Sequence, residues 1–227
     1  LVGEGEALAN MDTGEPLTGD ASTRRYERLH TPTGSTLIFM DQPPAAETQP
    51  CPPAATPAER EALGYNALAR LAAGRVEAFI ACAGYLTSRG LSAPQVVAAD
   101  APAGLAVLED LGDNLYARLI EQGADETPLY ETAIDALSVL HAEPPPKVLS
   151  AAGCDWPLLD YDEVALKTAS DLLIEWLPKF NGRLDFGQDA AAEWEAIWAP
   201  IRGAGAAGAS VFCHRDYHAE NLIWLAD

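Results

Sequence analysis

The sequence predicts an α+β protein with two lobes, a small β-rich lobe followed by a mainly helical lobe. Segments with β character are concentrated before Asp110, whereas helical periodicity dominates after Asp113. A dense polar cluster, His-Arg-Asp-Tyr-His-Ala-Glu-Asn, interrupts an apolar stretch near the end of the chain. This order predicts an N-terminal lobe over residues 1–110 and a C-terminal lobe over residues 111–227, with the crossover between Asp110 and Asp113.

The N-terminal lobe is predicted to open with a β-hairpin. Between Ser22 and Asp41, two segments with β character flank Thr-Pro-Thr-Gly, a turn cluster that ends at Gly34. Gly90 is expected to close a helix, because glycine favours the position just after a helix C-terminus. The remaining expected elements of this lobe are a proline-rich exposed loop (42–57), two helices (58–72 and 75–89) and two short strands (94–100 and 104–112).

The C-terminal lobe is predicted to contain four helices. Their expected ranges are 113–122, 127–142, 161–177 and 188–202. The Gly-Ala-Gly-Ala-Ala-Gly segment over 203–208 matches the letters of a nucleotide-binding glycine loop. Such a loop should follow a strand and open a helix, whereas this segment follows a helix. We therefore expect a flexible linker there.

Composition limits the classes of partner. The chain has 227 residues, of which 48% are hydrophobic, and carries a net charge of −20. Nucleic acids and anionic membranes both require a basic face, so neither is expected as a partner. No segment approaches the roughly 18 apolar residues of a membrane span. The four scattered cysteines indicate reduced thiols and a cytoplasmic location.

The polar cluster has the residue types of a phosphoryl-transfer site. Asp216 and Asn221 stand in the spacing D-x-x-x-x-N, and His214 precedes the aspartate by two residues. A carboxylate can take the proton of an attacking hydroxyl, and an amide oxygen can ligate Mg²⁺. We predict that His214 braces the loop, and that the apolar segments 210–213 and 222–225 form strands on either side of it.

Two other interpretations of this cluster carry less weight. A polar turn could contain an isolated aspartate and asparagine at this spacing, but the complete H-R-D-x-x-x-x-N between apolar segments is much rarer. His214 and His218 also lie four residues apart, as zinc ligands on a helix can. Here no glutamate stands between them, strands are expected on both sides, and no third ligand is evident.

A second group of residues could bind a nucleotide. Small residues at Gly19, Ala21 and Ser22 would let backbone N–H groups approach a phosphate. The densest basic cluster of this acidic chain follows them, although arginines on an exposed hairpin can also serve solubility alone. The apolar segment that ends near Gly112 could offer backbone groups to an adenine edge at Glu109 and Leu111.

The cluster resembles the catalytic loop of the aminoglycoside phosphotransferase and choline kinase branch of the protein-kinase-like fold. The segments GDASTRRYERL, AGYLTSRGLSAPQVVAAD and LAVLEDLGD are similar to a bacterial subgroup of sugar kinases, which phosphorylate the anomeric hydroxyl of N-acetylmuramate and N-acetylglucosamine during cell-wall recycling. The resemblance extends from about Thr18 to the end. It implies a protein-kinase-like fold, the cofactors ATP and Mg²⁺, and a small-molecule acceptor, most directly an amino sugar.

Carried over by motif, the resemblance makes Asp216 the catalytic base and Asn221 a Mg²⁺ ligand. It makes Glu109 and Leu111 part of the adenine hinge. The loop over the phosphates would comprise Gly19, Asp20, Ala21, Ser22 and Thr23, with Arg24 and Arg25 beside it.

The sequence departs from the family pattern at two places. The family carries a phosphate-binding lysine on its third strand, but no lysine precedes Lys147, and Met40 or Asp41 occupies that region. An arginine (Arg24, Arg25 or Arg28) is expected to substitute, and the glutamate that normally pairs with the lysine could be Glu59, Glu61 or Glu77.

The second departure is the metal-binding aspartate of a DFG-like segment, which would fall beyond Asp227. We therefore expect this chain, which begins with Leu, to be a C-terminally truncated piece of a longer reading frame. A non-catalytic kinase-like nucleotide-binding module remains an alternative, as does a kinase of the same fold acting on an aminoglycoside, choline or homoserine.

Overall fold

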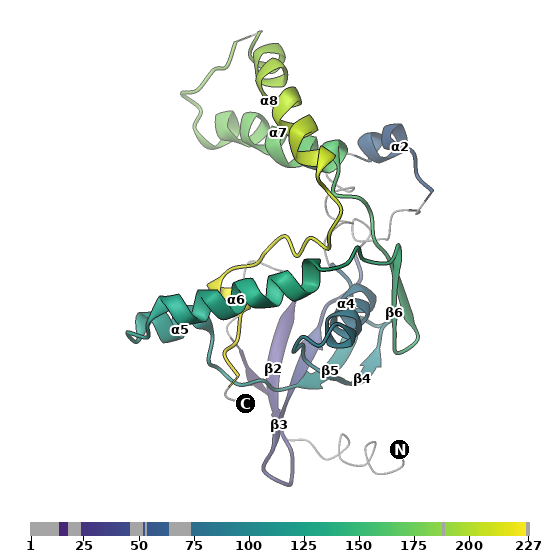
Figure 1. Ribbon diagram of the computed structural model, residues 1–227, viewed down its shortest axis with the longest axis vertical. Coiled ribbons are helices and arrows are strands. Elements are labelled where there is room, and N and C mark those ends of the chain that lie inside the picture. Colours follow the sequence, from purple (N-terminus) through teal and green to yellow (C-terminus); the bar gives the residue numbers. More distant parts are fainter. Residues whose placement is uncertain are drawn as a thin grey trace.

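A five-stranded antiparallel sheet forms the first part of the molecule (Figure 1). The computed structural model describes residues 14–17, 24–45, 52, 54–63, 74–187 and 189–225. The strands follow the order β1-β2-β3-β5-β4. They are β1 (Glu15–Pro16), β2 (Arg25–His30), β3 (Thr36–Asp41), β4 (Val96–Asp100) and β5 (Leu105–Glu109). Helices dominate the rest of the chain, which confirms the predicted α+β class.

The predicted hairpin is formed by β2 and β3. Their register pairs Arg25 with Asp41 at one end and His30 with Thr36 at the other. The turn between them closes through a hydrogen bond from the Gly34 N–H to a carbonyl oxygen three residues earlier, at 3.0 Å. Because side chains alternate along a strand, one face of the sheet is apolar and packs on the next helix. Its central members are Tyr26, Ile38, Met40, Ala106 and Leu108.

Helix α4 (Val76–Ser88) covers this apolar face and confirms the helix predicted over 75–89. The predicted glycine at its end, Gly90, has the positive φ of +79° that closes many helices. On its other side α4 meets a hairpin that was not predicted, β6 (Val148–Ala151) and β7 (Cys154–Pro157). Gly84 permits this contact, because a Cβ there would lie 2.3 Å from the Cβ of Ala151.

Four predicted helices of the C-terminal part are confirmed with shifted ends. They are α5 (Tyr116–Glu121), α6 (Glu126–His141), α7 (Glu163–Phe180) and α8 (Ala190–Ala207). The short α2 (Pro57–Ala62) begins the helix predicted over 58–72, and residues 64–73 lie outside the described residues. The flexible linker predicted over 203–208 is wrong, because α8 continues through most of it. Alanine favours the helix, and the Gly205 backbone packs closely against Leu166 of α7.

The two strands predicted beside the polar cluster are also wrong. Residues 210–213 have no regular structure, and 222–225 make a single bridge, between Ile223 and Leu115. Hydrogen bonds from Tyr116 N to Leu222 O (2.9 Å) and from Trp224 N to Asn114 O (2.8 Å) flank that bridge. A strand requires a neighbouring strand along its length. Among the described residues these apolar segments have none.

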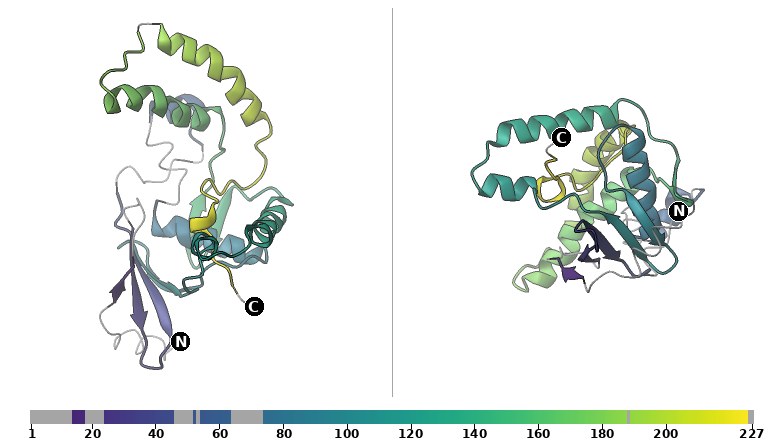
Figure 2. Two further views of the ribbon diagram at one scale, coloured as in Figure 1. Left: turned by 90° about the vertical axis from the view of Figure 1, so that its left-hand side faces the viewer. Right: turned by 90° about the horizontal axis from the view of Figure 1, so that it is seen from below.

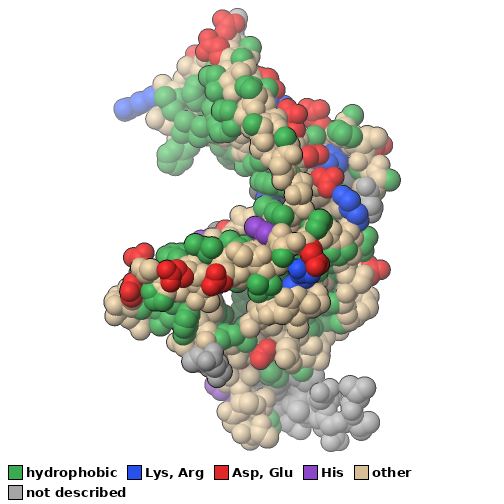
Figure 3. Space-filling view, viewed as in Figure 1, with side chains coloured by type: hydrophobic (Ala, Val, Ile, Leu, Met, Phe, Trp, Pro, Cys, Tyr) green, Lys and Arg blue, Asp and Glu red, His purple; other side chains and the backbone are tan. Residues whose placement is uncertain are grey.

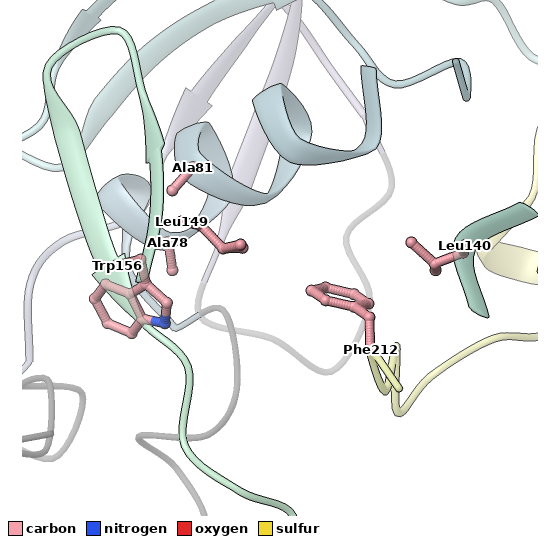
Figure 4. Close-up of a cluster of buried hydrophobic side chains, with 6 residues drawn as sticks. All are labelled: Ala78, Ala81, Leu140, Leu149, Trp156 and Phe212. Carbon is pink, nitrogen blue, oxygen red and sulfur yellow. The ribbon is translucent and has the colours of Figure 1, made fainter. Parts of the chain in front are cut away.

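One hydrophobic cluster joins the sheet side of the molecule to the helical side (Figure 4). Phe212, which directly precedes the polar cluster, lies between α4 and the end of α6. The cluster consists of Ala78, Ala81, Leu140, Leu149, Trp156 and Phe212. Its members come from both sides of the predicted boundary at residue 110, so the two lobes share packed surface. The division at that residue stays a prediction.

Helices α7 and α8 form a pair set apart from the sheet (Figures 1 and 2). Polar side chains hold the pair together: Lys167 of α7 contacts Glu195 of α8 at 3.4 Å, and the Trp194 indole of α8 donates to Asp171 of α7 at 3.0 Å. Apolar side chains gather on this pair next to a hollow above α6 (Figure 3). The exposed ones are Leu173, Trp176, Phe180, Ile197 and Ile201. No helix in the described ranges is both long and apolar enough to cross a membrane.

Two tryptophans, one in the shared hydrophobic cluster and one on the α7–α8 pair, should respond differently to truncation of the side chain. Trp156 is 4% exposed in the shared cluster, whereas Trp176 is 57% exposed on α7. We expect Trp156→Ala to lower the free energy of unfolding by about 3–5 kcal/mol, because it leaves a large cavity. Trp176→Ala should cost less than about 1 kcal/mol, mainly through its contact with Lys179. Urea unfolding followed by circular dichroism measures both; equal losses would contradict this description of the core.

Candidate active site

A cleft of about 2390 Å³ separates the sheet from the helices and the polar loop. Six of the predicted site residues line it: Arg24, Glu109, Leu111, His214, Asp216 and Asn221. Arg25 does not line the cleft, because it pairs instead with Asp41 of the neighbouring strand. The predicted phosphate loop, Gly19 to Thr23, lies outside the described residues. The structure therefore brings together residues that are almost two hundred positions apart in the sequence.

The polar loop places Asp216 and Asn221 in direct contact. The Asn221 side-chain nitrogen donates to the Asp216 carboxylate oxygen Oδ2 at 2.8 Å and to its backbone oxygen at 2.9 Å. A 3-10 turn, η2 (Ala219–Asn221), creates this proximity and packs against α5 (Figure 2). Since both amide hydrogens face Asp216, the Asn221 oxygen Oδ1 remains available as an acceptor.

The backbone immediately before the aspartate is strained. Arg215 has φ of +71°, a conformation that side-chain-bearing residues rarely adopt. Its guanidinium carbon lies 5.3 Å from the centre of the Tyr161 ring. Strained residues persist where their surroundings hold them, and they concentrate at functional sites. Asp216, the next residue, lines the cleft.

Aromatic and histidine contacts anchor the loop from behind. The Tyr217 hydroxyl donates to the carbonyl oxygen of Ala133 in α6 at 2.7 Å. Upstream, His141 Nε2 lies 3.1 Å from the Phe212 carbonyl oxygen. The ring of His214 meets Tyr217 edge-on at 5.3 Å. Partial burial lowers the pKa of His214, against the opposing effect of the Asp216 charge, so its ring is neutral at pH 7. This placement suits the predicted bracing role.

The predicted adenine hinge connects β5 to the helical part. The Glu109 N–H donates to the Gln95 carbonyl oxygen at 2.8 Å. In return the Gln95 N–H donates to the Glu109 side-chain oxygen Oε2 at 3.1 Å, where a regular antiparallel pair would use the Glu109 carbonyl. The Glu109 carbonyl is thus not required by Gln95, and Leu111 follows on the cleft wall.

The three candidate arginines occupy different positions. Arg28 is held by two carboxylates: it meets Asp110 at 2.7 and 3.2 Å and Asp113 at 3.0 Å twice. This network occupies the guanidinium, so Arg28 does not fit the role of the missing lysine. Arg24 lines the cleft and donates to the Tyr26 hydroxyl at 3.3 Å. Arg28 also lines the cleft but is held by Asp110 and Asp113, so we favour Arg24, which directly follows the predicted phosphate loop in the sequence.

The third strand itself supplies no cation. Met40 is fully buried among apolar side chains, with Val76 and Ile80 of α4 beside it. A lysine at that position would have to be buried in the same apolar cluster, which is costly without a partner. Of the candidate glutamates, Glu59 caps α2 and Glu77 pairs with Arg75 at 2.8 Å. Glu61 lies on α2.

The loop offers oxygen ligands suited to a hard cation. Asn221 Oδ1 and the Asp216 carboxylate are of the type that Mg²⁺ prefers, and Mg²⁺ usually takes one or two protein oxygens together with water and phosphate oxygens. No three His, Cys, Asp or Glu side chains converge as a metal-binding group in the part of the chain that the structure describes. The residues present thus fit a metal that a bound nucleotide helps to hold.

Several residues of the site were not predicted. The partners of Arg28, Asp110 and Asp113, were predicted only as the bounds of the crossover between the two lobes. Tyr217 was missed as an anchor, although an aromatic residue within a polar loop is a signal of packing. His218 was considered only as a zinc ligand; it lies 3.1 Å from Asp216 Oδ1.

The fold and this loop define a class of phosphoryl-transfer proteins, and the chain belongs to the phosphotransferase enzyme family, which it matches over residues 13–227. It is 68% identical to the N-acetylmuramate/N-acetylglucosamine kinase of Caulobacter vibrioides, in an alignment covering 94% of this chain and 58% of that relative. Relatives of the same name from Pseudomonas aeruginosa and Pseudomonas putida are 29% and 28% identical, across 92% and 91% of this chain and 50% of each relative. The chain thus spans about half the length of the curated relatives it matches.

Proposed function

We propose that the protein is an ATP-dependent kinase that phosphorylates a hydroxyl group of an amino sugar of the N-acetylmuramate or N-acetylglucosamine type. The observation that carries this proposal is the contact between Asp216 and Asn221 in a cleft that the β5 connection also lines. The printed names of the relatives support the choice of acceptor. We further infer a role in cell-wall recycling and, from the scattered cysteines, a cytoplasmic location.

The proposed reaction assigns a distinct role to each residue. Asp216 accepts the proton of the acceptor hydroxyl as that oxygen bonds to the γ-phosphorus of ATP and the bond to the leaving ADP oxygen breaks. Asn221 holds the Asp216 side chain through its amide hydrogens and presents Oδ1 to Mg²⁺. Bound Mg²⁺ neutralises phosphate charge. Glu109 and Leu111 offer backbone groups to adenine, and Arg24, which lines the same cleft, binds the phosphates.

The acidity of the chain makes these cations important. With a net charge of −20, the protein repels ATP except where local positive charge compensates. The described arginines nearest the hinge are committed to carboxylates, as Arg28 is to Asp110 and Asp113. Mg²⁺ is therefore the main expected source of compensation, and Arg24, which lines the cleft, is the proposed second one.

A non-catalytic nucleotide-binding module is the second candidate. It is favoured by the buried Met40 at the position where the family carries a lysine, and by the engagement of Arg28. A kinase acting on an aminoglycoside, choline or homoserine would use the same loop and cleft. Measuring which acceptor the protein phosphorylates, if any, distinguishes these candidates from the proposed amino sugar kinase.

An acceptor panel tests the proposal. The purified protein is incubated with Mg-ATP and, separately, with N-acetylmuramate, N-acetylglucosamine, an aminoglycoside, choline and homoserine, and ADP release is followed. We expect turnover with the two amino sugars above the rate without acceptor. Turnover only with another acceptor would refute the substrate assignment. ATP binding without turnover of any acceptor would favour the non-catalytic candidate.

A further inference from the structure

His218 contacts both residues of the proposed catalytic pair. Its Nε2 lies 3.1 Å from Asp216 Oδ1 and 3.2 Å from Asn221 Nδ2. Its other ring nitrogen, Nδ1, accepts a hydrogen bond from the Glu220 N–H at 3.4 Å and so caps η2. One imidazole thus links the carboxylate, the amide and the turn that carries them.

The hydrogen-bond inventory assigns the proton on this ring. Because Nδ1 accepts from Glu220, it carries no hydrogen in the neutral ring, so the hydrogen is on Nε2. The Asn221 amide has two hydrogens, and both are used by Asp216. Because Nε2 carries a hydrogen, it does not accept one from Asn221. It donates its hydrogen to Asp216 Oδ1. Every hydrogen on the His218 ring and the Asn221 amide then has an acceptor.

We propose that His218 is a positioning residue that fixes the Asp216 carboxylate for proton transfer. This inference rests on the proposed function. Asp216 receives one donor on each oxygen: His218 on Oδ1 and Asn221 on Oδ2. Two donors from residues two and five positions later determine the rotation of the carboxylate. With its rotation fixed, the carboxylate keeps lone pairs that can accept the proton of the acceptor hydroxyl.

Two substitutions separate positioning from capping. His218→Asn preserves an acceptor where Nδ1 stands, so it keeps the cap on η2, but its side chain is too short to donate to Asp216. His218→Gln places an amide N–H where Nε2–H stands and loses the cap. Positioning predicts that H218N lowers kcat for the amino sugar by about 10-fold, as loss of a supporting hydrogen bond at an active site does. It predicts that H218Q retains kcat near the wild-type value.

The KM for ATP and the thermal unfolding midpoint are measured for each variant. Under the proposal both stay at the wild-type values in H218N, because neither the nucleotide cleft nor the cap is altered. Any other pattern of kcat overturns the proposal. A lower kcat in H218Q together with an unchanged kcat in H218N would assign His218 to the cap alone. A lower kcat in both variants, or an unchanged kcat in both, would show that the Nε2–H donor has no specific role.

A second measurement requires no turnover. Nitrogen-15 NMR of histidine-labelled wild-type protein, with the His218 signal assigned from H218N, is expected to show a hydrogen on Nε2, the nitrogen that faces Asp216 Oδ1. A proton on Nδ1 would overturn the proposal. If the wild-type protein phosphorylates no amino sugar, the proposed function fails, and the NMR result still decides whether His218 donates to Asp216.

Discussion

Asp216→Asn is expected to lower kcat for the amino sugar by about 10²–10⁴-fold, the usual contribution of a general base. The substitution keeps the size of the side chain and removes its ability to take a proton. Asp216 is well exposed in the cleft, so its replacement leaves no buried group without a partner. The KM for ATP should change little, because the proposed adenine contacts are backbone groups at Glu109 and Leu111 and not the Asp216 side chain.

The matched control is Asp135→Asn, on the exposed face of α6 outside the cleft. This change removes the same charge from a chain of net charge −20 and should leave both kcat and thermal stability unchanged. Steady-state assays of ADP release on both variants make the comparison. Full activity in D216N would show that another group accepts the proton, and the proposed mechanism would be wrong.

Elements that depend on local sequence were predicted well. The β2–β3 hairpin, α4 and the helices α5 to α8 follow from alternation, helical periodicity and turn residues within a few positions. The β6–β7 hairpin was missed because its strands are four residues long and are stabilised by α4, more than sixty positions earlier. The strand predicted over residues 210–213 was wrong because the apolar character of that segment reflects the burial of Phe212 in the shared cluster and not a strand pairing.

The same distinction applies to the candidate site. Asp216 and Asn221 were predicted because their spacing lies within six residues of sequence. The contact of Arg28 with Asp110 spans 82 positions, and nothing in either segment specifies the other. The sequence consequently left open which of Arg24, Arg25 and Arg28 would replace the missing lysine. The structure separates it: Arg24 lines the cleft, Arg25 pairs with Asp41 and Arg28 joins the sheet to the hinge.

Arg28→Met is expected to lower the free energy of unfolding at pH 7 by about 3 kcal/mol, the lower end of the range for a broken buried ion pair. Side-chain exposure is 16% for Arg28 and 5% for Asp110, so the substitution leaves a buried carboxylate without its cation. Arg25→Met is the matched control on the same strand. The Arg25 side chain is 75% exposed, and loss of its pair with Asp41 should cost less than about 1 kcal/mol.

The deficit of Arg28→Met should also depend on pH, because it arises from a charged carboxylate. Burial raises the pKa of Asp110, but hydrogen bonds from Arg28, Thr36 and Gly112 together with the Arg28 charge outweigh it and hold that pKa below its usual value. A group whose pKa is lowered by folding stabilises the protein above its unfolded pKa of about 4, and that contribution is lost as pH falls through the folded value.

In the variant, Asp110 becomes easier to protonate, and protonation removes the cost of burying its charge. Urea unfolding of both proteins between pH 7 and pH 3 should therefore show the difference narrowing below about pH 4. A difference that stays constant over this range would mean that Arg28 stabilises the hinge by packing and not through the charge of Asp110.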